Sequence, residues 1–349
     1  MKATPSAGFA PDAMRAIPRS PLAVSQLGVG CAPFGIMGAD ASDEGVQDAF
    51  AALYAGGQRY YDVAPFYGTG LAEHRLGACL RRIDRRTVVL STKVGRLLHP
   101  SAGGAAAGAS GGAYPFTVGF DYSYDGTMRS LEHSMQRLGT NAIDIALIHD
   151  VNRRWQGDRV DQRYAEAMTG AYKALAQMRD SGVIKAIGVG VNDWTILERF
   201  AADGDFDCFM LAGRYTLLDH SALDTFLPDC ARRNIAVLMA APFNSGILAT
   251  GARPGATFFY TPAEPEIVAR TRRIEAVCAR HDVAIGAAAL QFPLAHPVIA
   301  SVVTGMRSAA EAAANLAHCR VSIPAAFWEE LKHEGLIANA APVGPLQVN

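Results

Sequence analysis

Four polar side chains of different chemistry follow short apolar stretches of this sequence. Asp62 and Tyr67 lie in the segment YYDVAPFYGTG, Lys93 follows the run VVLST, and His149 follows IDIALI. A buried carboxylate requires a cation beside it, and Lys93 is the candidate partner of Asp62. A carboxylate, a phenol, an ammonium and an imidazole in one site are suited to moving a proton between protein and substrate.

Each of these residues also has a structural interpretation when it is taken alone. Asp62 could cap a turn, Tyr67 could be a half-buried loop aromatic, Lys93 could be solvated, and His149 could be a structural histidine. Their shared position favours catalysis, because the carboxyl ends of the strands of a parallel barrel face one site. We expect Lys93 to lower the pKa of Tyr67. We expect His149 to donate a hydrogen bond to the reacting oxygen.

The elements that must position these residues are eight short apolar runs alternating with helical segments. Helical periodicity is found in segments 43–55, 71–82, 125–139, 164–181, 194–202, 221–233, 265–281, 285–292, 308–316 and 324–334. The apolar runs are 22–31, 59–62, 87–93, 143–148, 183–191, 208–212, 235–240 and 298–303. This alternation predicts an α/β fold, a single-domain (β/α)8 TIM barrel. A doubly wound open sheet is the alternative, but no GxGxxG opens a helix after the first run.

The barrel is expected to span residues 21–335. Residues 1–20 are rich in Pro and Ala and are expected to form a flexible segment, and residues 336–349 a C-terminal tail. Residues 101–113 contain only Gly, Ala and Ser, which is typical of a flexible insertion. This insertion is interpreted either as a disordered loop or, because it follows Lys93 closely, as a mobile lid.

Composition argues against several classes of partner. A net charge of −1 over 349 residues gives no reason to expect nucleic acid or an anionic membrane. No run approaches the ~20 apolar residues that span a bilayer, and no apolar secretory segment opens the chain. The six cysteines form no CxxC motif or metal-ligand pattern, so we expect free thiols, no metal and a cytoplasmic protein. The oligomeric state is not indicated.

The sequence resembles the aldo-keto reductase superfamily. The matching motifs are D-x-A-x-x-Y-G from Asp62 to Gly68, the Ser-Thr-Lys that ends at Lys93, and the Leu-Ile-His that ends at His149. They occur in the family's order, and the similarity runs from about residue 22 to 324. The stretches LIHD, GVGVND, AGRYTLLD and APFNSGIL are similar to the bacterial sugar 1-dehydrogenase group of that superfamily.

This resemblance implies a nicotinamide cofactor across the carboxyl end of the barrel and assigns roles to the four residues. Tyr67 would be the general acid and base, with Lys93 and Asp62 as its ion-paired supports, and His149 would orient the substrate oxygen. The expected reaction is oxidation of the C1 hemiacetal of an aldose, of the L-fucose or D-threo-aldose type, to a lactone. The alternatives are a pyridoxal 4-dehydrogenase, a general aldehyde or ketone reductase, and a nicotinamide-sensing subunit.

The resemblance also implies where the cofactor lies. Asn192 would hold the carboxamide, residues 242–248 would wrap the pyrophosphate, and residues 305–315 would hold the adenosine. Gly30 is expected to stay small because a ligand lies close. NAD or NADP would serve, and Glu311 favours NAD because it would repel a 2′-phosphate, whereas Arg307 could pair with one. The individual residues expected at the cofactor are Gly30, Asp62, Asn192, Pro242, Phe243, Asn244, Ser245, Gly246, Leu248, Gly305, Arg307, Glu311 and Asn315.

The substrate, a small molecule such as a sugar or aldehyde, is expected among loops after the strands. The candidate pocket residues are Phe34, Phe66, Trp155, Arg214 and Tyr215. The sequence departs from the family at Ala240, Ala241 and Ala212, where many reductases have side chains that contact the nicotinamide.

Overall fold

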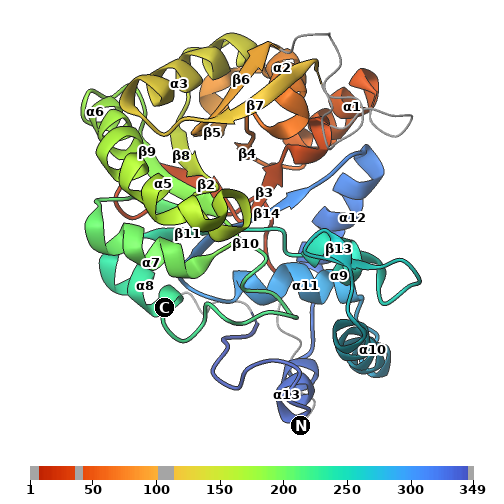
Figure 1. Ribbon diagram of the computed structural model, residues 1–349. Helices are drawn as coiled ribbons and strands as arrows, with labels where there is room; N and C mark the ends of the chain where they lie inside the picture. Colours follow the sequence, from red (N-terminus) through yellow and green to blue (C-terminus); the bar gives the residue numbers. More distant parts are fainter. Residues whose placement is uncertain (1–7, 36–41, 101–113, 345–349) are drawn as a thin grey trace.

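Eight parallel strands form a closed barrel in the part of the chain that the computed structural model describes, residues 8–35, 42–100 and 114–344 (Figure 1). In their order of pairing they are β10 (Cys208–Ala212), β11 (Ala236–Ala240), β14 (Ile299–Gly305), β3 (Leu27–Gly30), β4 (Tyr60–Asp62), β5 (Val89–Val94), β8 (Ile145–His149) and β9 (Ala186–Val191). Each lies within or overlaps one of the predicted apolar runs. The predicted TIM barrel is therefore confirmed.

Helices surround the strands (Figure 1), and every predicted helical segment overlaps at least one of them. Their bounds are α1 (Asp43–Ala55), α2 (Leu71–Leu80), α3 (Tyr124–Leu138), α4 (Arg153–Gln156), α5 (Val160–Glu166), α6 (Tyr172–Asp180), α7 (Trp194–Asp203), α8 (Phe226–Arg233), α9 (Ile247–Thr250), α10 (Pro265–Arg280), α11 (Ile285–Leu294), α12 (Ala309–Arg320) and α13 (Ala325–His333). Helix α1 begins as expected, because the Ser42 hydroxyl accepts a hydrogen bond from the amide of Gly45 at 3.0 Å.

Alternate residues of the strands face two different apolar layers. In β8, Ile145 and Leu147 belong to a smaller cluster of residues inside the barrel, whereas Ala146 and Ile148 pack in the larger cluster shared with the helices. This alternation is the expected geometry of a strand whose two faces are both covered. It leaves the strand ends as the places where polar side chains gather.

The N-terminal segment corrects the expectation of a flexible residue range 1–20. Strand β1 (Met14–Ala16) pairs antiparallel with β2 (Ala23–Ser25). Ile17, between these strands, has no exposed surface and packs with residues of the barrel interior. Burial of the Ile17 side chain holds this hairpin in place. The two strands are too short to show the alternation of apolar and polar residues by which a strand is recognised in a sequence. Residues 1–7 lie outside the described part of the chain.

Three other segments differ from expectation. Leu336 and Ile337, placed in the tail, are buried in the core, so the ordered fold continues past residue 335. The segment expected as one helix over 164–181 begins earlier and consists of α5, a π-helical turn at Ala167–Ala171, and α6. Strands β6 (Arg96–Pro100) and β7 (Phe116–Phe120) form an antiparallel hairpin around the Gly/Ala/Ser insertion. The insertion itself, residues 101–113, lies outside the described residues.

Candidate active site

Three of the predicted residues lie at the carboxyl ends of neighbouring strands: Asp62 in β4, Lys93 in β5 and His149 in β8. Lys93 donates from Nζ to Oδ2 of Asp62 at 2.6 Å and to the carbonyl of Val63 at 3.1 Å. The other oxygen of Asp62 accepts from the Ser91 hydroxyl at 2.7 Å. Asp62 and Lys93 are both buried, so each charge is compensated by the other and by neutral hydrogen bonds.

Tyr67 is held above this ion pair by a tight loop. Gly68, Thr69 and Gly70 all have positive φ, at 61°, 47° and 99°. A Cβ atom on Gly68 would lie 2.2 Å from the carbonyl oxygen of Gly35, so only glycine fits at this crossing. The Tyr67 ring centroid lies 4.8 Å from Lys93 Nζ and 6.2 Å from the centroid of the His149 ring, which meets it edge-on. The structure thus brings all four predicted residues together.

Lys93 acts on the pKa of Tyr67 in the expected direction, but the net pKa is raised. Burial raises the pKa of the phenol to about 12, and the charge of Lys93, which lowers it, does not overcome this effect. Asp62, which neutralises Lys93, raises the pKa of Tyr67 further. The protonated phenol is therefore the dominant form of Tyr67 at neutral pH.

His149 is a neutral imidazole. Burial, together with the charges of Arg96 and Lys93, lowers the pKa of His149 well below its ordinary value. Its Nε2 lies 3.3 Å from Oδ2 of Asp150, and its Nδ1 is buried without a hydrogen-bond partner. The backbone carbonyl of His149 accepts a hydrogen bond from the Tyr122 hydroxyl at 2.7 Å. A neutral imidazole can still donate one hydrogen bond to a substrate oxygen.

Sequence reasoning missed two residues beside this group, Arg96 and Asp150. Arg96 is buried, forms an ion pair with Asp150, and packs its guanidinium against the rings of Phe66 at 3.9 Å and Trp155 at 4.2 Å. Asp150 directly follows His149, and Arg96 follows Lys93 by three residues. Their proximity along the chain to two predicted site residues was the available signal.

The loop after β11, expected at the pyrophosphate, has an unusual backbone. Ala241, Asn244, Ser245 and Gly246 have positive φ, at 55°, 45°, 64° and 107°. Successive left-handed residues form concave turns whose amide groups can bind an anion. A Cβ atom on Gly246 would meet nothing within 4 Å, so the loop faces open space there. The amides of Asn244 and Gly246 donate to the carbonyls of Ala241 and Phe243, so the expected contact of this loop with a pyrophosphate remains a prediction.

Asn244 positions this loop. Its Oδ1 accepts from the Thr216 hydroxyl at 2.6 Å and its Nδ2 donates to the carbonyl of Gly213 at 3.2 Å. The side chain is buried, so the expected contact of Asn244 with the cofactor is corrected to support of the loop from behind. The side chain of Asn192 is only partly engaged. Its Oδ1 accepts from Nδ2 of Asn152 at 3.2 Å, but its Nδ2 has no hydrogen-bond partner among the described residues.

At the expected adenosine end, Arg307 and Glu311 bind each other. The Arg307 guanidinium donates to Glu311 Oε1 at 2.9 Å, and its backbone amide donates to Oε2 at 2.8 Å. The two residues that were expected to oppose each other over a 2′-phosphate are thus partners at the start of α12, where Arg307 precedes the helix and Glu311 lies in its first turn. Gly305, at the end of β14, pairs with Gly30 of β3, so two expected glycines are neighbours.

Most of the sequence matches one family. The sequence model of the aldo/keto reductase family covers residues 26–334, which include all four residues of the site. The chain belongs to the aldo/keto reductase family. This confirms the resemblance stated from the motifs, and it makes the protein an oxidoreductase.

Named relatives and solved structures agree with this. A pyridoxal 4-dehydrogenase of Microbacterium luteolum is 42% identical over 339 residues, which are 93% of this chain and 98% of the relative. A D-threo-aldose 1-dehydrogenase of a Pseudomonas species is 37% identical over 323 residues, 90% of this chain and 95% of the relative. A holo-form aldo-keto reductase structure from Bacillus halodurans covers 94% of this chain and 97% of its own with a TM-score of 0.72 at 22% identity, which supports the fold.

Two substrate candidates of this aldo/keto reductase are wrong. Phe34 and Tyr215 have no exposed surface, so neither can contact a ligand in this structure. Tyr215 packs against Phe292 and His296, with ring centroids 5.0 and 5.6 Å away, beneath α11. Aromatic residues after strands are ambiguous in sequence, because the same loop can turn toward the core or the site.

The other three substrate candidates lie nearer the site. Phe66 and Trp155 enclose Arg96 beside Asp150, and Trp155 is 41% exposed. Arg214 donates from Nε to the carbonyl of Asn192 at 2.9 Å. The substrate contacts of Phe66, Trp155 and Arg214 remain predictions, and Arg214 lies beside Asn192, the residue expected at the carboxamide.

The cysteines supply no nucleophile to this site. All six are free and buried. Cys31, after β3, lies beside the site, because its backbone amide donates to the carbonyl of Asp62 at 2.7 Å. Burial and the charge of Asp62 raise the pKa of the Cys31 thiol well above its ordinary value, so the thiol is inert. Among the described residues, no cluster of three His, Cys, Asp or Glu could hold a metal ion.

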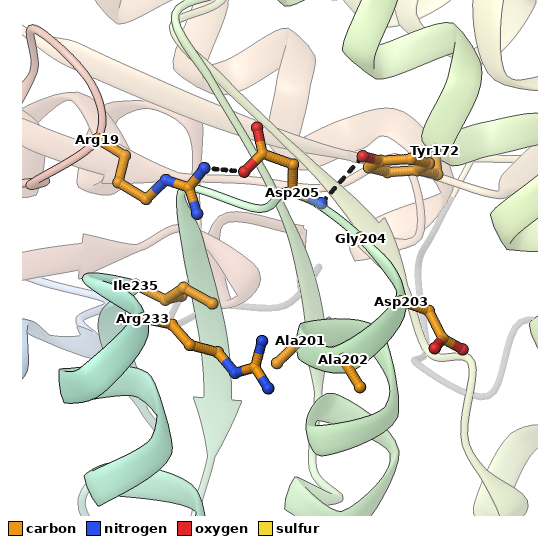
Figure 2. A pocket seen from close by; sticks show the side chains of 9 residues that line it. All are labelled: Arg19, Tyr172, Ala201, Ala202, Asp203, Gly204, Asp205, Arg233 and Ile235. Carbon is orange, nitrogen blue, oxygen red and sulfur yellow. Dashed lines mark hydrogen bonds and ion pairs between the residues drawn. The ribbon is translucent and has the colours of Figure 1, made fainter.

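A separate hollow of about 510 Å³ lies at the opposite end of the barrel, before β10 and β11 begin (Figure 2). Arg19 and Asp205 form an ion pair at its edge, and the amide of Asp205 donates to the Tyr172 hydroxyl at 2.9 Å. Catalytic sites of TIM barrels lie at the carboxyl ends of the strands. This hollow is therefore not the active site.

In the described ranges, no helix is long and apolar enough to cross a membrane.

Proposed function

We propose that this aldo/keto reductase is an NAD(P)-dependent dehydrogenase that oxidises the C1 hemiacetal of an aldose to a lactone. The observation that carries the proposal is the buried Asp62–Lys93 pair beneath Tyr67, with the neutral ring of His149 beside it. This arrangement supplies one proton acceptor and one hydrogen-bond donor to a single oxygen atom.

The proposed roles follow from the charges. Tyr67, as phenolate, takes the proton from the C1 hydroxyl of the hemiacetal. Lys93 stabilises that phenolate, and Asp62 keeps the ammonium fixed and charged. His149 donates to the same oxygen as it becomes a carbonyl. A cyclic hemiacetal is already at the aldehyde oxidation level, so loss of a proton and a hydride gives a lactone without a thiol nucleophile.

A nicotinamide, when bound, would accept the hydride from C1. The amide nitrogen of Asn192, which has no hydrogen-bond partner among the described residues, suits a carboxamide, and the open left-handed turn at Gly246 suits the pyrophosphate. Pro242, Phe243 and Ser245 of the same loop, and Asn315 of α12, remain proposed cofactor neighbours, whereas Leu248, in α9, has no exposed surface and cannot contact the cofactor in this structure. The Arg307–Glu311 pair withdraws the cation that a 2′-phosphate requires, which supports NAD over NADP.

The proposed substrate is an aldose of the L-fucose or D-threo-aldose type, supported by the relative named D-threo-aldose 1-dehydrogenase. A second candidate is pyridoxal, which also forms a cyclic hemiacetal. It is supported by the relative named pyridoxal 4-dehydrogenase and by the partly exposed aromatic face of Trp155, on which a pyridine ring could stack. The same proton chemistry serves both substrates.

The test is to incubate the purified protein with oxidised NAD or NADP and L-fucose, D-arabinose or pyridoxal. Products are identified by mass spectrometry at early times, with Tyr67→Phe as the control. Lactone formation by wild type, and not by the variant, supports the proposal and identifies the substrate. Alcohol formation from aldehydes with reduced cofactor, and no lactone from any hemiacetal, would instead assign a reductase.

A further inference from the structure

Asp150 has a strained backbone next to the site. Its φ is 58°, in the left-handed region, which costs energy for a residue that has a Cβ atom. The surrounding structure holds it there: its amide donates to the carbonyl of Gly190 at 3.0 Å, and its carbonyl accepts from Nε2 of Gln156 at 3.0 Å. This conformation directs the side chain of Asp150 back toward His149, the residue that precedes it.

The Asp150 carboxylate has three neighbours. Oδ2 accepts from the Arg96 guanidinium and lies 3.3 Å from Nε2 of His149. Oδ1 lies 3.5 Å from Nδ2 of Asn152. The carboxylate therefore contacts a cation, an imidazole and an amide at once, and only the imidazole belongs to the predicted catalytic group.

Arg96 serves Asp150 rather than a substrate. The rings of Phe66, Trp155 and Phe120 surround its guanidinium at 3.9, 4.2 and 4.8 Å, and the residue is 2% exposed. A ligand has no access to a cation that is enclosed in this way. Burial raises the pKa of Asp150, and the charge of Arg96 in the ion pair opposes this rise and favours the ionised carboxylate.

An ionised Asp150 decides which nitrogen of the neutral His149 carries the proton. Oδ2 of Asp150 lies 3.3 Å from Nε2 without the geometry of a hydrogen bond, so its negative charge stabilises a proton on Nε2 while the N–H stays available to the reacting oxygen. The remaining nitrogen, Nδ1, is then a buried acceptor without a partner. An unpaired buried acceptor is less costly than an unpaired buried N–H. Both ends of the ring thus favour the same tautomer.

We propose that Asp150 is a positioning residue that selects the Nε2–H tautomer of His149, the form that donates to the reacting oxygen. The role in the reaction rests on the proposed function, whereas the tautomer itself does not. Asp150→Asn keeps the size of the side chain, but its amide group can donate to Nε2 and thereby favour the Nδ1–H form. In a Ser-His-Asp triad the aspartate binds the other imidazole nitrogen, and there the same substitution also gives the wrong tautomer and a large loss of kcat.

The first test reads the tautomer directly, by NMR of the 15N-histidine-labelled protein. His149→Ala identifies the His149 signals by removing them. We expect a protonated Nε2 in wild type and a protonated Nδ1 in Asp150→Asn. Protonated Nδ1 in wild type, or an unchanged tautomer in the variant, overturns the proposal. Because this measurement uses no substrate, it decides the assignment even if no hemiacetal is oxidised.

The second test is a double-mutant cycle on kcat. Asp150→Asn should lower kcat by about 10²–10³-fold, the effect of losing one donor to the reacting oxygen, with KM changed less than about threefold. In a His149→Ala background the same substitution should change kcat less than about threefold, because no imidazole remains to be oriented. An equal loss in both backgrounds would mean that Asp150 acts on the fold alone, and would overturn the proposal.

A matched control is available on the same strand. Asp144 precedes β8 at the other end of the barrel, is buried, and pairs with Arg85 at 2.7 Å and Lys185 at 2.8 Å. Asp144→Asn should lower the melting temperature at least as much as Asp150→Asn while kcat stays within about threefold of wild type. A loss of kcat in this control equal to that of Asp150→Asn would attribute the effect to destabilisation and overturn the proposal.

Discussion

Lys93 Nζ lies 2.6 Å from Oδ2 of Asp62, and the two side chains are only 2% and 3% exposed. They come from the adjacent strands β4 and β5, so the barrel itself fixes their separation. Burial lowers the pKa of Lys93, but the charges of Asp62 and Tyr67 raise it, and the net direction is upward. Lys93 therefore remains an ammonium beneath the phenol of Tyr67.

Breaking this ion pair should destabilise the fold. Asp62→Asn leaves the Lys93 charge buried without compensation, and we expect the free energy of unfolding to fall by about 3–5 kcal/mol. The control is Asp229→Asn, which breaks the more exposed pairs with Arg232 and Arg233 and should cost less than about 1 kcal/mol. Urea denaturation measures both. Equal losses of unfolding free energy in the two variants would show that burial of the Asp62–Lys93 pair does not increase the cost of breaking it.

Tyr67→Phe should remove catalysis without removing the cofactor. The variant keeps the ring that packs beside Lys93 and His149 but lacks the hydroxyl that exchanges the proton. We expect kcat to fall by at least about 10²-fold, and the Kd for the nicotinamide, measured by fluorescence quenching, to stay within about threefold. Turnover within threefold of wild type would remove Tyr67 from its proposed role.

The rate of oxidation should rise with pH without reaching a plateau below about pH 11. The pKa of Tyr67 is raised to about 12, so the reactive phenolate fraction increases about tenfold for each pH unit below that value. Initial rates from pH 7 to 10.5 at saturating substrate test this. A plateau near pH 8 would mean that the bound state lowers the phenol pKa far more than Lys93 does in this structure.

Cofactor preference should depend on Glu311. We expect NAD to be used at least as well as NADP. Glu311→Gln removes the charge that holds Arg307, which frees a cation for a 2′-phosphate, and kcat/KM for NADP should rise about tenfold, or ~1.4 kcal/mol. Glu329→Gln, on the exposed surface of α13, is the control and should change neither value. An unchanged kcat/KM for NADP in Glu311→Gln would mean that the 2′-phosphate does not bind near Arg307.

The barrel and the four residues of the site could be predicted because the strands are short apolar runs, and a polar residue stands at or next to the end of three of them, β4, β5 and β8. Asp62, Lys93 and His149 needed only that position to be grouped. The pairing of Arg96 with Asp150 could not be predicted, because a cation enclosed by three rings depends on packing between segments far apart in the sequence. The same holds for the burial that raises the pKa of Tyr67.

Other predictions failed because a strand was too short to recognise or because a loop turned its side chain toward the core. Strands β1 and β2 have three residues each, which is too short for a periodic pattern. Phe34 and Tyr215 follow strands as predicted, but their loops turn these rings into the core. The expectations for residues 101–113 remain predictions.

Transfer of the C1 hydrogen of a hemiacetal is the central claim, and isotope labelling tests it most directly. L-fucose and D-arabinose labelled with deuterium at C1, and pyridoxal labelled at its aldehyde carbon, are incubated with oxidised NAD or NADP and the purified protein. We predict that, for at least one of them, mass spectrometry finds the deuterium in the reduced nicotinamide and an unlabelled lactone as the first product. A reduced nicotinamide without deuterium, or no lactone from any of the three, would contradict the account.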